Sequence, residues 1–103
     1  MVVPVTARAA ILLALVRGKG FGLELIELVR KRTKGAVKLG QGSVYPLLRE
    51  LEDEGLVRSF EADPLPERGG RPRRYYELTA LGRRAAQEQR NVVLAIADLA
   101  GAT

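Results

Sequence analysis

Apolar residues recur at helical spacing in four stretches of this 103-residue chain. The stretch at 6–17 is apolar around most of its circumference, which predicts a helix buried on more than one side. The stretches at 23–34 and 41–54 each carry one apolar stripe, as amphipathic helices do. A turn is expected at 19–22. In the last helix, expected at 80–99, apolar positions follow a coiled-coil-like spacing, which indicates a seam for a partner helix.

Residues with strong end preferences stand at the borders of these expected helices. Thr6 and Thr79 are placed to cap N-termini, because a threonine oxygen accepts hydrogen bonds from the free N–H groups of a first turn. Gly18 and Gly55 are placed to end helices, since glycine readily takes the left-handed conformation found there. Pro46 lies inside the third helix and is expected to distort its first turn.

Two short strand-like runs, 56–61 and 75–79, separate the third and fourth helices. The segment between them is rich in arginine, glycine and proline, as a hairpin tip requires. On the second run Tyr76 and Leu78 share a face, and Leu78 is expected to point inward. The order helix, helix, helix, strand, basic tip, strand, helix predicts a winged helix-turn-helix domain, a mainly α fold with a small β-hairpin (α+β).

The composition favours a polyanionic partner and argues against catalysis. Lysine and arginine outnumber aspartate and glutamate by 17 to 12, which gives a net charge of +5. A basic balance of this size suits nucleic acid but does not by itself identify it. The chain has no cysteine and no histidine. Disulfides, thiolate nucleophiles and the usual general base are therefore excluded, and no enzyme activity, cofactor or metal is expected.

No segment has the length of a membrane span or the pattern of a secretion signal. The apolar run at 9–16 is too short to cross a bilayer, and no cleavage motif follows it, so the cytoplasm is the expected location. The basic cluster at 30–34 matches the dipole at the end of the second helix. The acidic run at 50–54 is expected to be a solvated face, because its carboxylates are adjacent in sequence and do not converge as metal ligands do.

Polar side chains face outward near the start of the third helix. Gln41, Ser43, Tyr45 and Arg49 can form hydrogen bonds with base edges and phosphates. The acidic end of the same helix would repel phosphate, so only its first half is expected to enter a DNA groove.

Four segments taken together resemble the PadR family of bacterial transcriptional regulators: 22–26, 42–52, 54–57 and 70–82. The resemblance implies a homodimer that associates through its C-terminal helix. It further implies that the third helix enters a major groove of double-stranded DNA at a palindromic operator, with the wing along the minor groove or backbone. Members typically repress transcription, and many are released by small aromatic or hydrophobic effectors.

Carried over position by position, the resemblance assigns DNA contacts to two elements. The recognition helix would supply Gln41, Gly42, Ser43, Tyr45 and Arg49. The wing would supply Arg68, Gly70, Arg71 and Arg73. Two departures stand out: Gly40 occupies the place of a serine-like cap, and the chain has no tryptophan, so an aromatic ligand clamp cannot be carried over.

The last helix is expected to form the dimer. The DNA-binding domain would span 1–78 and the dimerisation helix 79–103. Its seam consists of Leu81, Ala85, Val92, Ala95, Ile96 and Leu99. A candidate effector pocket between two such helices would be lined by Val92, Val93 and Ile96, although these residues could equally well just pack the dimer core.

Two alternatives to DNA binding stay open from the sequence. A winged helix can serve as a protein-interaction module, because fold does not determine function. In that case the arginines of 68–74 would contact an acidic protein. An RNA-binding role would show as a preference for hairpin RNA over duplex DNA.

Overall fold

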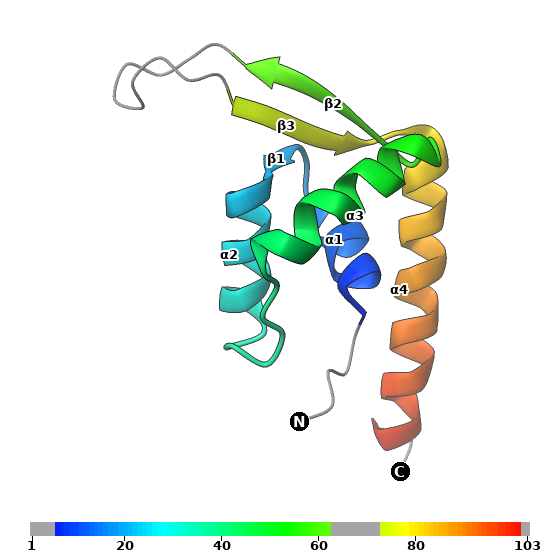
Figure 1. Cartoon of the computed structure of the whole chain (residues 1–103). Helices are drawn as coiled ribbons and strands as arrows, with labels where there is room; N and C mark the ends of the chain where they lie inside the picture. The colour runs from blue at the N-terminus through cyan, green and yellow to red at the C-terminus, as the bar shows by residue number, and fades with distance from the viewer. Residues whose placement is uncertain (1–5, 63–72, 102–103) are drawn as a thin grey trace.

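The computed structural model describes residues 6–62 and 73–101. Along the chain the elements are α1 (Ala7–Leu15), β1 (Gly20–Phe21), α2 (Gly22–Arg32), α3 (Gln41–Asp53), β2 (Val57–Ala62), β3 (Arg73–Leu78) and α4 (Ala80–Gly101). Figure 1 shows the helices grouped below the hairpin of β2 and β3. This mainly helical fold with a small antiparallel sheet confirms the predicted winged helix-turn-helix class.

The hydrophobic core lies where the helices meet the base of the sheet. Ile11 and Leu15 from α1 pack there with Val44 and Leu48 from α3, and all four side chains are essentially inaccessible to water. Because α1 has neighbours on several sides, most of its residues are buried, as its apolar circumference predicts. Leu78 also joins this core, which confirms its expected inward orientation.

The sheet has three antiparallel strands in the order β1-β3-β2. The prediction of a plain turn at 19–22 is therefore wrong in part, because Gly20 and Phe21 form a short strand opposite Tyr76 and Tyr75. This pairing joins residues far apart in the sequence, and two residues are too few to show an alternating pattern. The strand ties the start of α2 to the wing.

The expected caps are present. Thr6 Oγ1 accepts from the Ala9 N–H at 3.1 Å at the start of α1, and Thr79 Oγ1 accepts from the Gly82 N–H at 3.0 Å in the first turn of α4. Gly55 follows α3 with a φ of 79°, the left-handed conformation expected there.

Element ends differ from the predicted ones by a few residues. α1 ends at Leu15 rather than at residue 17, and α4 continues to Gly101 rather than to residue 99. The strands cover Val57–Ala62 and Arg73–Leu78 instead of 56–61 and 75–79. Helix ends depend on local hydrogen bonds that apolar periodicity does not report.

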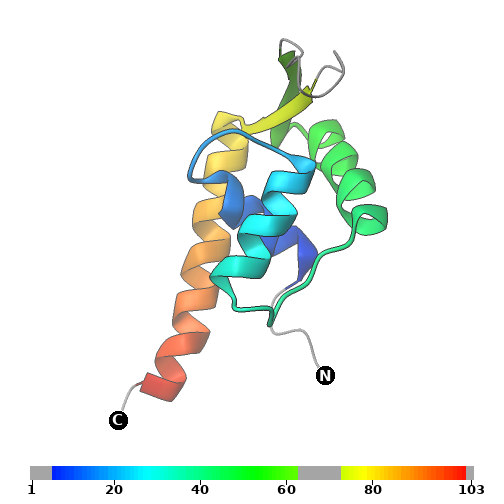
Figure 2. The same ribbon diagram turned by 90° about the vertical axis from the view of Figure 1, so that its left-hand side faces the viewer.

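α4 presents two different faces. In its first turns Gly82 and Ala86 are buried against the body of the protein. Its last turns project beyond the other helices, as Figures 1 and 2 show from two directions. There Ile96 is 63% and Leu99 79% exposed. Within the described residues, no helix is long and apolar enough to cross a membrane.

Among the described glycines, Gly82 is the one whose position would be most crowded by a side chain. A Cβ atom added there would lie 1.8 Å from the Leu56 carbonyl oxygen, which is backbone and cannot move aside cheaply. Gly82→Ala should therefore lower the free energy of unfolding by about 3 kcal/mol, the upper part of the range for overpacked sites. Urea denaturation followed by circular dichroism would measure the loss.

Gly42→Ala is the matched control for this prediction. Gly42 also lies in a helix, but no atom comes within 4 Å of an added Cβ. Alanine should stabilise this position by up to about 1 kcal/mol through its better helix propensity. Equal stability of the two variants would contradict the proposed close contact at Gly82.

Candidate nucleic-acid interface

The first half of α3 offers a polar, exposed face. Gln41, Gly42, Ser43, Tyr45 and Arg49 are all exposed. The apolar residues of the same helix point the other way, into the core. Pro46 does not interrupt the helix. The sequence-predicted recognition residues therefore share an accessible surface, and their contact with DNA remains a prediction.

Gly40 precedes this helix and caps it through its backbone alone. Its carbonyl oxygen accepts from the N–H groups of Ser43 at 3.1 Å and Val44 at 3.0 Å. No side chain satisfies the first N–H groups of α3. The N–H groups of the first turn that do not bond to Gly40 lie at the positively polarised end of the helix. A phosphate oxygen would be favoured there.

Tyr45 is less free than its place on the helix surface suggests. Its ring lies so close to Gly22, at the start of α2, that a Cβ there would be 2.5 Å from the Tyr45 Cε1 atom. The side chain is only 36% exposed. The ring therefore anchors α3 to α2, which leaves a smaller part of Tyr45 for contact with a ligand.

Arg73 is the only predicted wing residue within the described part of the chain, since Arg68, Gly70 and Arg71 lie outside it. The Arg73 guanidinium carbon lies 5.1 Å from the centre of the Phe21 ring, and Nη1 donates to the Tyr75 hydroxyl at 3.2 Å. Arg73, the first residue of β3, thus lies against the sheet.

An aromatic row crosses the outer face of the sheet, with one ring from each strand. The Tyr75 ring stacks on Phe60 at 5.9 Å and meets Phe21 edge-on at 5.6 Å. The Lys19 ammonium lies 5.5 Å from the centre of the Tyr75 ring. Such contacts stiffen the wing. Sequence reasoning missed this row because Phe21 was assigned to a turn.

The acids at the end of α3 are all exposed, as expected for a solvated face. Glu54 also accepts two hydrogen bonds from Arg8 in α1, at 2.6 and 2.8 Å. These bonds lower the pKa of the Glu54 carboxyl and raise the pKa of the Arg8 guanidinium. The sequence did not indicate this contact between α3 and α1.

Glu52 is also exposed, and it connects α3 to the wing. Its Oε2 atom accepts from the Ser59 hydroxyl at 2.6 Å and from the Ser59 N–H at 3.2 Å. Arg74 extends the chain, because Nη1 donates to the Ser59 hydroxyl at 2.9 Å and Nη2 to Glu61 at 3.1 Å. These contacts tie the recognition helix to both strands of the wing. The described residues hold no metal-ligating cluster.

A hollow of about 360 Å³ opens between α3 and β3. It is lined by Tyr45, Arg49, Glu52, Arg74 and Tyr76. Tyr76 is only 5% exposed, and burial raises the pKa of its hydroxyl. Arg74 and Tyr76 were not among the predicted site residues. The sequence offered one indication of them: in a strand, Arg74 lies on the same face as Tyr76, so an arginine stands beside a tyrosine there.

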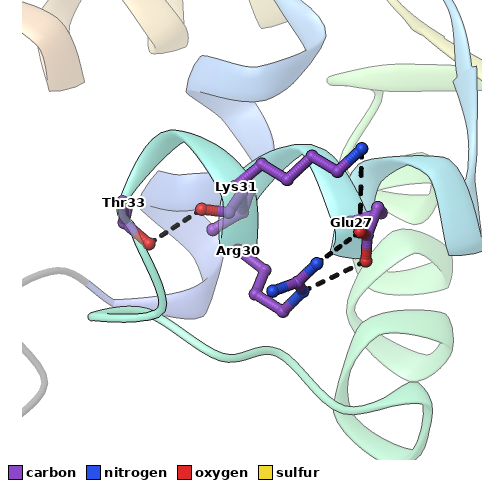
Figure 3. Close-up of polar contacts among 5 residues, drawn as sticks. Glu27, Arg30, Lys31 and Thr33 are labelled. Carbon is purple, nitrogen blue, oxygen red and sulfur yellow. Dashed lines mark hydrogen bonds and ion pairs between the residues drawn. The ribbon is translucent and has the colours of Figure 1, made fainter.

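The basic end of α2 carries its own counter-charge. Figure 3 shows Arg30 and Lys31 turned toward Glu27, one turn earlier on the same helix. The hydrogen bond from Arg30 lowers the pKa of the Glu27 carboxyl. Thr33 donates to the Val29 carbonyl oxygen at 2.8 Å and ends the helix. This arrangement agrees with the interpretation of the cluster as a match to the helix dipole.

Sequence comparison places most of the chain in a known family. Residues 11–88 match the model of the transcriptional regulator PadR-like family. The chain belongs to the PadR-like family of transcriptional regulators. The resemblance carried by the four sequence segments is thereby confirmed, and the family is one of regulators and not of enzymes. No curated protein sequence gave a significant match.

Solved structures of transcriptional regulators share the fold. A transcriptional regulator from Clostridium thermocellum superposes with a TM-score of 0.75 at 20% identity, covering 92% of this chain and 89% of that one. A PadR-like regulator from Bacillus cereus gives 0.73 at 23% identity, with 91% and 86% covered. Bacillus subtilis PadR in complex with operator DNA gives 0.69 at 22% identity, with 79% of this chain and 44% of that one.

Proposed function

We propose that this PadR-like regulator is a sequence-specific double-stranded DNA-binding protein that represses transcription, acting as a homodimer on a palindromic operator in the cytoplasm. The observation that carries the proposal is the accessible polar first half of α3 beside a wing that the Glu52–Ser59 contact ties to it. A relative of the same fold has been solved with operator DNA. In the proposed complex α3 reads bases, and the wing contacts the backbone or minor groove.

The homodimer is supported by the exposed stripe on α4. Leu81, Val92, Ile96 and Leu99 are large, apolar and at least half exposed. Ala85, from the same predicted seam, packs partly against the core. Burying such a stripe against a second copy removes apolar surface from water. A two-fold pair would also present two recognition helices to successive turns of DNA, about 34–36 Å apart.

The protein-interaction alternative has less support. It requires an acidic partner, whereas exposed hydrogen-bonding residues on α3 suit base edges and phosphates. A stable complex with a protein partner that duplex DNA does not displace would favour this alternative. Preference for hairpin RNA over every duplex would favour the RNA-binding alternative instead.

Selection of bound duplexes from a random library is the first test of the proposed function. It should return an inverted repeat, and affinity for that duplex should fall with salt at a log–log slope of about −0.9 per phosphate neutralised.

Ser43→Ala should change the preferred bases, because base-edge contacts carry specificity. Arg71→Ala should weaken all duplexes to a similar extent, because phosphate contacts do not distinguish sequences. Absence of binding to all duplexes at low salt would reject the proposal.

The dimer has a separate test. Ile96→Glu introduces a charge into the proposed seam and should convert the dimer to monomer, since burying an unpaired carboxylate is costly. Light scattering coupled to size exclusion would measure the mass. Leu94→Glu is the matched control, because Leu94 is also exposed on α4 but lies outside the proposed seam. A dimer that survives Ile96→Glu, or that Leu94→Glu disrupts equally, would contradict this interface.

Effector control completes the proposed function. The candidate pocket of Val92, Val93 and Ile96 would form only between two copies of α4. A second apolar hollow, about 250 Å³, lies between α1 and α2 and includes Ala14.

Hydrophobic aromatic compounds titrated into an operator complex should release the DNA. Val92→Ala should weaken that response several-fold, whereas Ala14→Leu, which fills the α1–α2 hollow, should not. The reverse pattern, or no release by any compound, would reject the α4 pocket.

A further inference from the structure

The hollow between α3 and β3 combines charge, hydroxyl groups and partial enclosure. Arg49 and Arg74 approach it from the recognition helix and the wing, and Tyr45 and Tyr76 complete its wall. The C-terminal half of α3 rises toward the hairpin of β2 and β3 (Figure 1), and α3 contacts β2 there. Guanidinium groups and phenolic hydroxyls are donors that anionic oxygens accept well.

Tyr76 adds a hydroxyl group to the wall of the hollow. The residue as a whole is only 5% exposed and lines the hollow, and its hydroxyl is not one of the buried atoms left without a partner. The hydroxyl therefore stays accessible from the hollow, where it can donate to an anionic oxygen. Since the ring packs in the core, the place of this hydroxyl is fixed.

Arg74 is held in place for such a ligand. Through the Ser59 hydroxyl it is linked to Glu52, and through Nη2 it is paired with Glu61 at 3.1 Å. The Arg74–Glu61 pair is half exposed on both sides, and exposed pairs of this kind contribute little stability. An anion in the hollow can therefore take over Nη2 from Glu61 at small cost.

The acidic neighbours set the specificity of the hollow. Glu52 and Glu61 offset the charges of Arg49 and Arg74, so a free anion gains little from charge alone. A DNA phosphate differs, because α3 and the wing would already hold the backbone beside the hollow. Glu52 and Glu61 thus lower the affinity of the hollow for a free phosphate, whereas a phosphate of a bound duplex is already held beside it.

We propose that the α3–β3 hollow binds one backbone phosphate of duplex DNA in each protomer, with Arg49, Arg74 and the Tyr76 hydroxyl as donors. Glu52 is a positioning residue that holds Arg74 through Ser59. The proposal rests on the proposed DNA-binding function and adds to it a contact that flanks the recognition helix. The site clamps the backbone between helix and wing, so that the register of α3 in the groove depends on Tyr76 and Arg74.

Three substitutions in the full chain test this site on the selected duplex. Arg74→Gln should weaken binding about tenfold and make the salt slope shallower by about 0.9, the value for one phosphate contact. Tyr76→Phe keeps the ring and removes only the hydroxyl, and it should weaken binding about threefold to tenfold, as loss of an ordinary hydrogen bond does. Glu61→Gln should have the opposite sign and strengthen binding a few-fold, because it releases Arg74.

Arg58→Gln is the matched control. Arg58 forms an equivalent cross-strand pair with Glu77 at 2.7 Å, but on the opposite face of the sheet. It should leave affinity for the duplex within about twofold, in keeping with the small worth of exposed ion pairs. Equal losses for Arg58→Gln and Arg74→Gln would indicate a general charge effect and overturn the site.

Neutral phosphate analogues locate the contact on the DNA. A methylphosphonate placed at successive backbone positions should weaken the wild-type complex about tenfold at one position per half-site, and should add nothing further in the Arg74→Gln variant. Unchanged binding of Arg74→Gln and Tyr76→Phe, or additive losses at every position, would overturn the phosphate site while leaving DNA binding intact. Failure to bind any duplex would overturn both proposals.

Discussion

The junction between α3, β2 and α4 is the constraint on which the rest of the molecule depends. The Leu56 carbonyl oxygen accepts from the Thr79 N–H at 3.0 Å, and the Thr79 hydroxyl donates to the Gly55 carbonyl oxygen at 2.6 Å. Gly82 leaves room for this approach because it has no Cβ. One threonine thus joins the end of the third helix, the start of the wing and the first turn of the last helix.

This junction makes two surfaces of the protein geometrically dependent on each other. The exposed face of α3 and the exposed stripe of α4 lie on helices that meet at the Thr79 contact. In the proposed dimer, any change in how two copies of α4 pack would therefore change the separation of the two recognition helices. Operator binding tolerates little change in that separation, because half-sites recur with the turn of DNA. A ligand between the α4 helices could act on DNA affinity through this coupling alone.

Features set by local chemistry could be predicted from the sequence. The helices, the caps at Thr6 and Thr79, the left-handed Gly55 and the exposed start of α3 each depend on residues within a turn or two. The winged fold followed from the order of these elements. The short strand β1 did not, because its identity rests on pairing with Tyr75 and Tyr76, more than half the chain away. Tyr45 was expected to face outward, and its packing on Gly22 has the same long-range origin.

Glu52 shows why the candidate site could be predicted only in part. In the sequence it is one of several neighbouring acids, and a solvated face is the expectation for such a run. In the fold it accepts two hydrogen bonds from Ser59, because α3 ends where β2 begins and the chain turns back beside its own helix. Residue type gave no indication of which acid would meet the wing. Periodicity can show which side of a helix is polar, but only the packing of the wing decides which polar residues on that side become fixed. The recognition surface therefore has two kinds of members: residues such as Ser43, recognisable from their exposed place on one helix, and residues such as Arg74, whose position depends on two elements at once.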